Sequence, residues 1–158
     1  MAPALELTPM TATCRSECCS AAPRFTVNEL FERGFRRRRA APLPLEGAAC
    51  ADSGGNFAQF SLAVAEGRIG AVNFRCASCA TLIAYCELIA ETVPGLTTEI
   101  ARALSAEELI STLPGVPAHK HDRAVLAVAA FRAALASIPI EQGKPDHEGR
   151  LHLRHPAA

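Results

Sequence analysis

Two cysteines separated by two residues form the most informative chemical motif in this sequence. Cys76 and Cys79 lie where a strand-like pattern gives way to a helix-like one. Backbone amides and the dipole at the start of a helix stabilise a thiolate, so Cys79 should be a better ligand or nucleophile than an ordinary thiol. A lone C-x-x-C is compatible with half of a zinc site, a redox pair, a cluster corner or two small buried residues.

The surroundings of the motif disfavour two of these interpretations. No second C-x-x-C follows to complete a four-cysteine zinc site, and no βαβ pattern precedes the pair, as in a thioredoxin-like redox site. The sequence alone excludes neither. Cys86 lies further along, in an apolar helical stripe, and we expect it to be a buried core residue.

The number of cysteines has a different meaning in a reducing and in an oxidising cell compartment. The chain has 7 cysteines in 158 residues. It has no stretch of roughly 18 apolar residues and no basic region followed by an apolar run at its start, which predicts neither a membrane span nor a signal peptide. We therefore expect a cytoplasmic protein, in which free thiols point to metal, cluster or redox chemistry. Its 16 basic and 16 acidic residues give no broadly basic surface for nucleic acid.

The helices and strands that must position the motif follow from hydrophobic periodicity. Residues 1–24 show no period and are expected to form a flexible arm, residues 25–138 one domain, and residues 139–158 a disordered polar tail. A short amphipathic helix should begin at Val27 and end before Pro42. A Gly-rich turn at residues 52–56 should precede a β-hairpin, with strands at 57–64 and 69–74.

The second half of the domain is predicted to be helical. A nearly buried helix should follow Cys79 and stop at Pro94, and a capping box at Ser105 should start a short helix ending near Leu113. A long helix over residues 118–137 comes last. The predicted fold is α+β, with a small antiparallel sheet of about three strands packed against helices on one face.

Several short motifs occur in a specific order along this pattern. They are Gly67-Arg-Ile69, Phe74, Cys79-Ala-Thr81, Ile83-Ala84, Leu113 and Leu126-Ala127. Together with the order of elements from Val27 to Ala136, they resemble the U-type iron-sulfur cluster assembly scaffolds, the IscU and NifU N-terminal family. Members of this family build a [2Fe-2S] or [4Fe-4S] cluster transiently on three cysteines and an aspartate. They take sulfur from a cysteine desulfurase and pass the cluster to acceptor apoproteins.

The resemblance implies a scaffold function, with Cys79 in the place of the family's central ligand. The family's first ligand run, Cys-Gly-Asp, has two alternative positions. In a gap-free register it falls on residues 54–56, Gly-Gly-Asn, which offer no thiolate. In a second register, Cys50 and Asp52 keep both ligand types at the cost of a few inserted residues. The strand pattern favours the first register for the fold, and the choice of ligands stays open.

The family's third cysteine, in a His-Cys pair near the start of the last helix, falls on Asp122-Arg123. Arginine cannot coordinate iron. His119, His121 and Asp122 lie within a turn of that place, and imidazole and carboxylate are reasonable ligands for iron or zinc.

Two site models follow from the resemblance. In the first, Cys79 with Cys76 or Cys50, Asp52 and one of His119, His121 or Asp122 binds iron, a transient cluster or, in the isolated protein, zinc. In the second, the fold binds no metal and acts as a docking module or regulator. Cys-His catalysis by Cys79 is the weakest alternative, because nothing supplies an oxyanion hole or an orienting third group, and we expect no enzyme.

Two segments are candidates for partner docking. Arg36, Arg37, Arg38 and Arg39 follow the first helix, where members of the family meet the desulfurase, although a charge run is usually a solvated face. Leu113, Pro114, Val116 and Pro117 with Lys120 partly resemble the family's L-P-P-V-K chaperone-recognition run and differ from it at two positions. The alternative for this segment is a simple helix boundary.

Overall fold

The computed structural model of the chain describes residues 24–140. Its elements are α1 (Val27–Arg37), β1 (Leu45–Glu46), β2 (Cys50–Ala51), β3 (Phe57–Ala65), β4 (Arg68–Cys76), α2 (Ala80–Thr92), α3 (Thr98–Arg102), α4 (Ala106–Thr112), the 3₁₀ turn η1 (Ala118–Lys120) and α5 (Asp122–Ala136). The predicted arm and tail lie outside the described residues, apart from residues 24, 139 and 140. No helix in the described range is long and apolar enough to cross a membrane.

The sheet is antiparallel and small. β3 and β4 form the predicted hairpin through the turn at Glu66-Gly67, and both short strands pair with the other edge of β3. β1 lies opposite residues 61–62 and β2 opposite residues 57–58. The four strands therefore form three rows, because β1 and β2 share one edge. The predicted α+β fold is confirmed.

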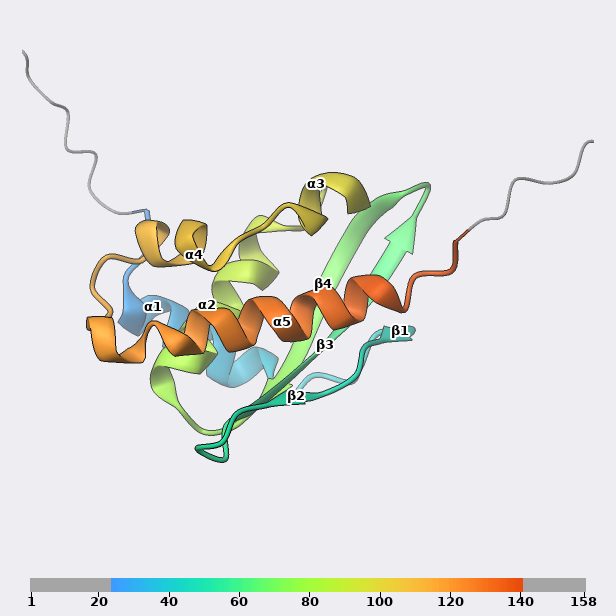
Figure 1. Ribbon diagram of the computed structural model, residues 1–158. Coiled ribbons are helices and arrows are strands. Elements are labelled where there is room, and N and C mark those ends of the chain that lie inside the picture. Colours follow the sequence, from blue (N-terminus) through green and yellow to red (C-terminus); the bar gives the residue numbers. More distant parts are fainter. Residues whose placement is uncertain (1–23, 141–158) are drawn as a thin grey trace, which may run out of the picture.

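Helices cover one face of this sheet. In Figure 1, α5 runs across the sheet over β3, and α1 and α2 lie side by side behind it. The ring of Phe60 lies 5.8 Å from that of Phe74 and 5.6 Å from that of Phe131 on α5, measured between centroids. Every residue of α2 from Thr81 to Ala90 is buried, as the predicted buried helix requires.

Local signals explain most of the element boundaries. Thr26 caps α1 and Ser105 caps α4, each in a capping box with the glutamate three residues later. The five-residue helix α3 was not predicted, since it is too short to show a helical period. The last helix begins at Asp122 rather than 118, because residues 118–120 form a 3₁₀ turn.

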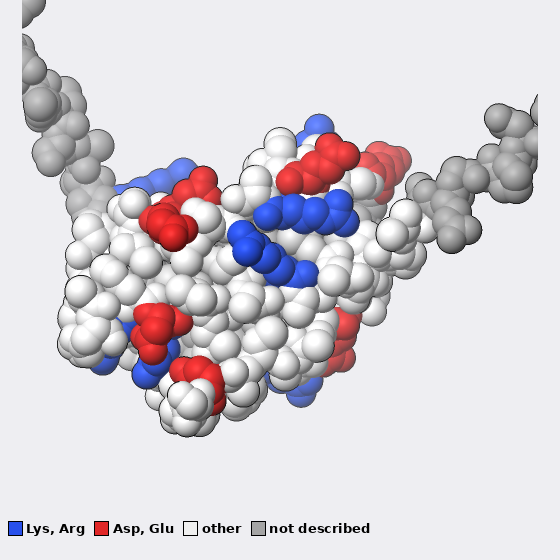
Figure 2. All heavy atoms as spheres, in the orientation of Figure 1, with Lys and Arg blue, Asp and Glu red and all other residues white. Residues whose placement is uncertain are grey.

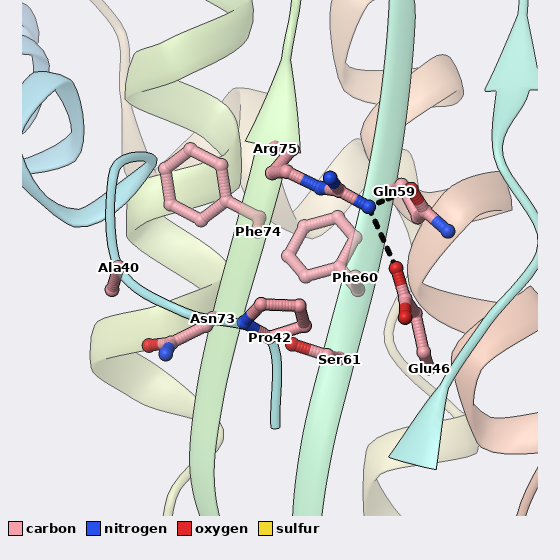
Figure 3. Close-up of a pocket in the computed structure, with 9 residues that line it drawn as sticks. All are labelled: Ala40, Pro42, Glu46, Gln59, Phe60, Ser61, Asn73, Phe74 and Arg75. Carbon is pink, nitrogen blue, oxygen red and sulfur yellow. Dashed lines mark hydrogen bonds and ion pairs between the residues drawn. The ribbon is translucent and has the colours of Figure 1, made fainter. Parts of the chain in front are cut away.

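The segment between α1 and β1 covers part of the other face. The backbone N–H of Leu43 donates to Ser61 Oγ at 2.9 Å, and Asn73 Nδ2 donates to the carbonyl of Ala41 at 3.0 Å. Figure 3 shows this region, where Arg75 reaches across to Glu46. Ser61 is thereby buried with its hydroxyl satisfied.

Gly47, between β1 and β2, fixes how closely this edge approaches α5. Its N–H donates to the carbonyl of Phe60, and its carbonyl accepts from Gln59 Nε2. A Cβ at Gly47 would lie 2.5 Å from the backbone nitrogen of Ala134. Because the obstacle is helix backbone, only glycine allows this approach.

Replacing Gly47 by Ala should therefore lower the free energy of unfolding by about 2–3 kcal/mol, since α5 or the strand edge must move to make room. Chemical denaturation of both proteins would measure this difference. Gly70→Ala is the matched control, because a Cβ there meets only the Ala63 carbonyl at 3.6 Å, and its expected effect is within about 0.5 kcal/mol. Equal stabilities of the two variants would contradict the close approach.

Candidate functional site

Cys79 lies at the start of a buried helix, as predicted. It is the N-cap residue of α2, with extended backbone (φ −103°, ψ 118°), and its carbonyl accepts from the N–H of Ile83 at 2.9 Å. Its side chain is half-buried and packs against the edge of the core. The first turn of α2 contains no acidic residue, so no side chain there offsets the positive end of the helix dipole.

Cys50 and Cys76 lie in one row across the sheet. Both are directly opposite Ala58, one on each side of β3. Directly opposed residues of antiparallel strands present their side chains to the same face. Two strand spacings separate the outer backbones by roughly 10 Å, so the small Ala58 side chain stands between these two cysteines.

Cys76 has a partner inside the core. A hydrogen bond with Cys86 lowers the pKa of Cys76, and burial raises the pKa of Cys86 well above its ordinary value. Cys76 is 7% exposed and Cys86 is fully buried. The predicted core position of Cys86 is confirmed, and each thiol shifts the pKa of the other.

Asp52 organises the turn that follows β2. Its Oδ1 accepts from the backbone N–H groups of Gly54 and Asn56, both at 2.9 Å, and Asn56 Nδ2 donates to Oδ2 at 2.9 Å. These hydrogen bonds, first those from Asn56, lower the pKa of the Asp52 carboxyl. The carboxylate is therefore held in one orientation, with its second oxygen facing α5.

Arg123 of α5 joins the two ligand candidates. Its Nη1 lies 3.4 Å from Asp52 Oδ2, and it also pairs with Asp122. Contact with the Cys79 thiol is the main cause that raises the pKa of Arg123. The side chain is 22% exposed, and its buried Nε has no hydrogen-bond partner among residues 24–140.

The position of Arg123 was predicted only as a lost ligand. The structure adds that its guanidinium contacts Cys79 and Asp52 together. Figure 1 shows why these three residues can meet, because the turn after β2, the loop before α2 and the start of α5 lie at the same end of the domain. The only sequence signal for this role was that an arginine stands where the family has a ligand. No sequence pattern predicted which residues Arg123 contacts.

The remaining metal-ligand candidates lie around the start of α5. His121 Nε2 is 3.2 Å from the carbonyl oxygen of Val116, so this ring is bound within its own loop. His119 is exposed in η1, and the side chain of Asp122 is 60% exposed. Within residues 24–140, no three His, Cys, Asp or Glu side chains gather in an arrangement that could hold a metal ion.

The four arginines do not act as one surface, and only Arg38 and Arg39 follow the first helix, since α1 ends at Arg37. Arg37 forms a two-pronged ion pair with Glu87 of α2, at 2.7 Å and 3.1 Å, and the Glu87 side chain is only 1% exposed. Arg38 stacks over Phe35 and donates to Ser78 Oγ, beside Cys79. Sequence analysis missed Glu87, although one charged residue in an apolar helix was a signal that it needed a partner.

The other docking candidates also divide into buried and exposed residues. Arg36 and Arg39 are exposed. In the second segment, Leu113 is 1% exposed and Val116 6%, whereas Pro114, Pro117 and Lys120 are at the surface. Acidic and basic side chains alternate over the face shown in Figure 2, without a large area of one sign.

A family model described as the NifU-like N terminal domain matches residues 32–144, most of the chain. No curated protein matches the sequence at a significant level.

Solved structures share the fold at low sequence identity. A candidate iron-sulfur cluster assembly scaffold protein for the SUF system from Fervidobacterium islandicum AW-1 is 14% identical, with a TM-score of 0.51, over 68% of this chain and 94% of that one. A nitrogen-fixing NifU-like protein (N-terminal) from Brucella abortus is 20% identical, with a TM-score of 0.40, over 68% of this chain and 80% of that one.

The turn geometry generates a test of the Asp52 contacts. Asp52→Ala removes both the turn hydrogen bonds and the ion pair, and should lower the thermal midpoint by roughly 3 °C or more. Asp52→Asn keeps an oxygen acceptor for the turn and should fall between wild type and Asp52→Ala. Glu46→Ala breaks an exposed pair with Arg75 and should change the midpoint little. Identical midpoints for Asp52→Ala and Glu46→Ala would show that the turn does not depend on Asp52.

Proposed function

Because the chain belongs to the family of NifU-like N-terminal domains, we propose that it acts in iron-sulfur cluster assembly as a scaffold-like protein. Iron or a transient cluster, such as [2Fe-2S], is then cargo that the protein binds and hands to acceptors. The protein is a carrier rather than an enzyme in this proposal. A reducing compartment such as the cytoplasm would keep Cys79 a free thiol.

One observation carries the proposal: Asp52 and Cys79, from separate elements, meet at the same side chain, since Asp52 Oδ2 lies 3.4 Å from Arg123 Nη1 and the nearby Cys79 thiol raises the pKa of Arg123. A sulfur and a carboxylate are the two ligand types that the family resemblance assigns to these positions. Both side chains are partly exposed, so an incoming ion can reach them from solvent. This geometry also favours Cys50-Ala-Asp52 over residues 54–56 as the ligand run, because it is Asp52 that faces α5.

Further donors must complete the site, since two protein ligands hold iron poorly. Cys50 is the first candidate, because it begins β2 two residues before Asp52 and is half-buried beside α5. Cys76 would have to leave Cys86, and His121 would have to leave the Val116 carbonyl. His119 can approach from the surface, Asp122 would have to leave Arg123, and zinc could take the same donors in the isolated protein.

We also place partner docking near Cys79. Arg38 donates to Ser78 in the loop before α2, so an acidic partner surface that binds Arg38, Arg36 and Arg39 would lie over the site. A cysteine desulfurase that delivers sulfur, and the acceptor apoproteins, are the partners this role requires. Pro114, Pro117 and Lys120 provide a second exposed segment for a partner.

A second candidate function is a metal-free docking module or regulator on the same fold. Arg123 favours it, because its positive charge already pairs with Asp52. In this case the fold would keep partner surfaces and bind no cargo.

Anaerobic reconstitution with ferrous iron and sulfide separates the two functions. All compared proteins should carry Cys14→Ala, Cys18→Ala and Cys19→Ala. These three thiols lie outside the described residues, and their removal ensures that they bind no metal in the experiment. The scaffold function predicts visible absorption with bound iron and sulfide, which Cys79→Ala abolishes. Cys86→Ala is the matched control, because it removes a fully buried thiol and should leave binding intact.

The opposite results are equally specific. Iron and sulfide that remain at full content in Cys79→Ala would refute Cys79 as the ligand. Absence of a chromophore in the parent protein, with the fold intact, would favour the docking module.

A further inference from the structure

We propose that Arg123 is the specificity-determining residue of the Cys79 site. Its guanidinium occupies the site as an internal cation, so the site excludes a metal ion until this side chain leaves Cys79 and Asp52. This inference rests on the proposed function, because it concerns what controls cargo binding at the same site.

The contacts of Arg123 carry the first step of this inference. Nη1 lies 3.4 Å from Asp52 Oδ2, while the Cys79 thiol contacts the same guanidinium. The turn fixes Asp52 through hydrogen bonds to Gly54 and Asn56. The carboxylate therefore has a fixed position, and Arg123 takes the place that a metal ion bound to both groups would need.

Charge gives the second step. A guanidinium stays positive at every pH at which a protein is folded, and it cannot act as a metal ligand. A divalent cation would meet a like charge close to its ligands, in a partly buried place where water screens weakly. Metal binding at Cys79 and Asp52 is therefore coupled to removal of the Arg123 side chain.

The contacts of Arg123 differ in exposure, which gives the guanidinium an outward partner. Asp122 pairs with the same guanidinium and is 60% exposed, whereas Asp52 is 27% exposed. The pair with Asp122 can persist when the guanidinium moves outward. The buried Nε has no acceptor among the described residues, and an unpaired buried N–H weakens the inward position. An anion at Cys79 would supply that acceptor, whereas a cation would not.

Zn²⁺ titration of the full chain tests the exclusion of metal. Arg123→Gln keeps a polar side chain of similar length without the charge, and it should bind Zn²⁺ about tenfold more tightly than wild type. Arg123→Lys keeps the charge and should stay close to wild type. Arg75→Gln, which removes an exposed arginine paired with Glu46, is the control for general loss of positive charge. Each protein is compared with its Cys79→Ala derivative, so that only binding that depends on Cys79 is counted.

Alkylation of the Cys79 thiol measures the charge around it without any metal. Iodoacetate is an anion and iodoacetamide is neutral, so the ratio of their rates at one thiol reports the local charge and not the fraction of thiolate. Mass spectrometry of the Cys79 peptide gives this ratio in the presence of the other cysteines. Arg123→Gln should lower the ratio severalfold, while Arg75→Gln leaves it unchanged.

Unchanged Zn²⁺ affinity in a folded Arg123→Gln protein would overturn the proposal, as would an unchanged alkylation ratio. The proposed scaffold function fails on a different result, namely cargo that persists after Cys79 is removed. The two failures are therefore distinguishable.

Discussion

The backbone of α5 lies against the backbone of the β1–β2 segment at Gly47, and this close approach holds the C-terminal part of α5 against the edge of the sheet. The short strands β1 and β2 lie on the edge of β3 through their own pairing. Asp52 and Arg123, which are 71 positions apart in the sequence, meet at the other end of the same helix. The core packing of Phe60 on Phe131 fixes the same helix from the sheet side.

The candidate site already holds a positive charge without cargo. Where the family resemblance implies a third ligand for a metal ion, this chain supplies a positive charge that pairs with Asp52 and contacts Cys79. In the proposed function, this one residue type places an ion pair where the resemblance implies part of a metal site, while the helix start and the turn stay in place. The proposed scaffold and docking functions therefore differ in what the Arg123 guanidinium does.

The sequence predicted that Arg36 to Arg39 form one docking surface, but the fold separates these four side chains. Arg37 is taken into the α1–α2 interface by Glu87, 50 positions away, while its neighbours reach the loop before α2 or the solvent. Burial raises the pKa of Glu87 even with Arg37 beside it, so this pair is part of the structure and not a free docking charge. Leu113 and Val116 belong to the core for the same kind of reason, because partners distant in sequence cover them.

The sequence by itself determined the longer elements and the place of Cys79 at a helix start, but not the short elements β1, β2 and α3. Hydrophobic periodicity, capping boxes and the Gly-rich turns predicted the hairpin, the buried helix after Cys79 and the long last helix. They could do so because these signals act over a few residues. Only the tertiary structure decided that Asp52 pairs with Arg123 of α5, that Cys76 lies beside Cys86 in the core, and that the same guanidinium lies near Cys79. These contacts join segments far apart in the chain, and no local pattern encodes the approach of one backbone to another.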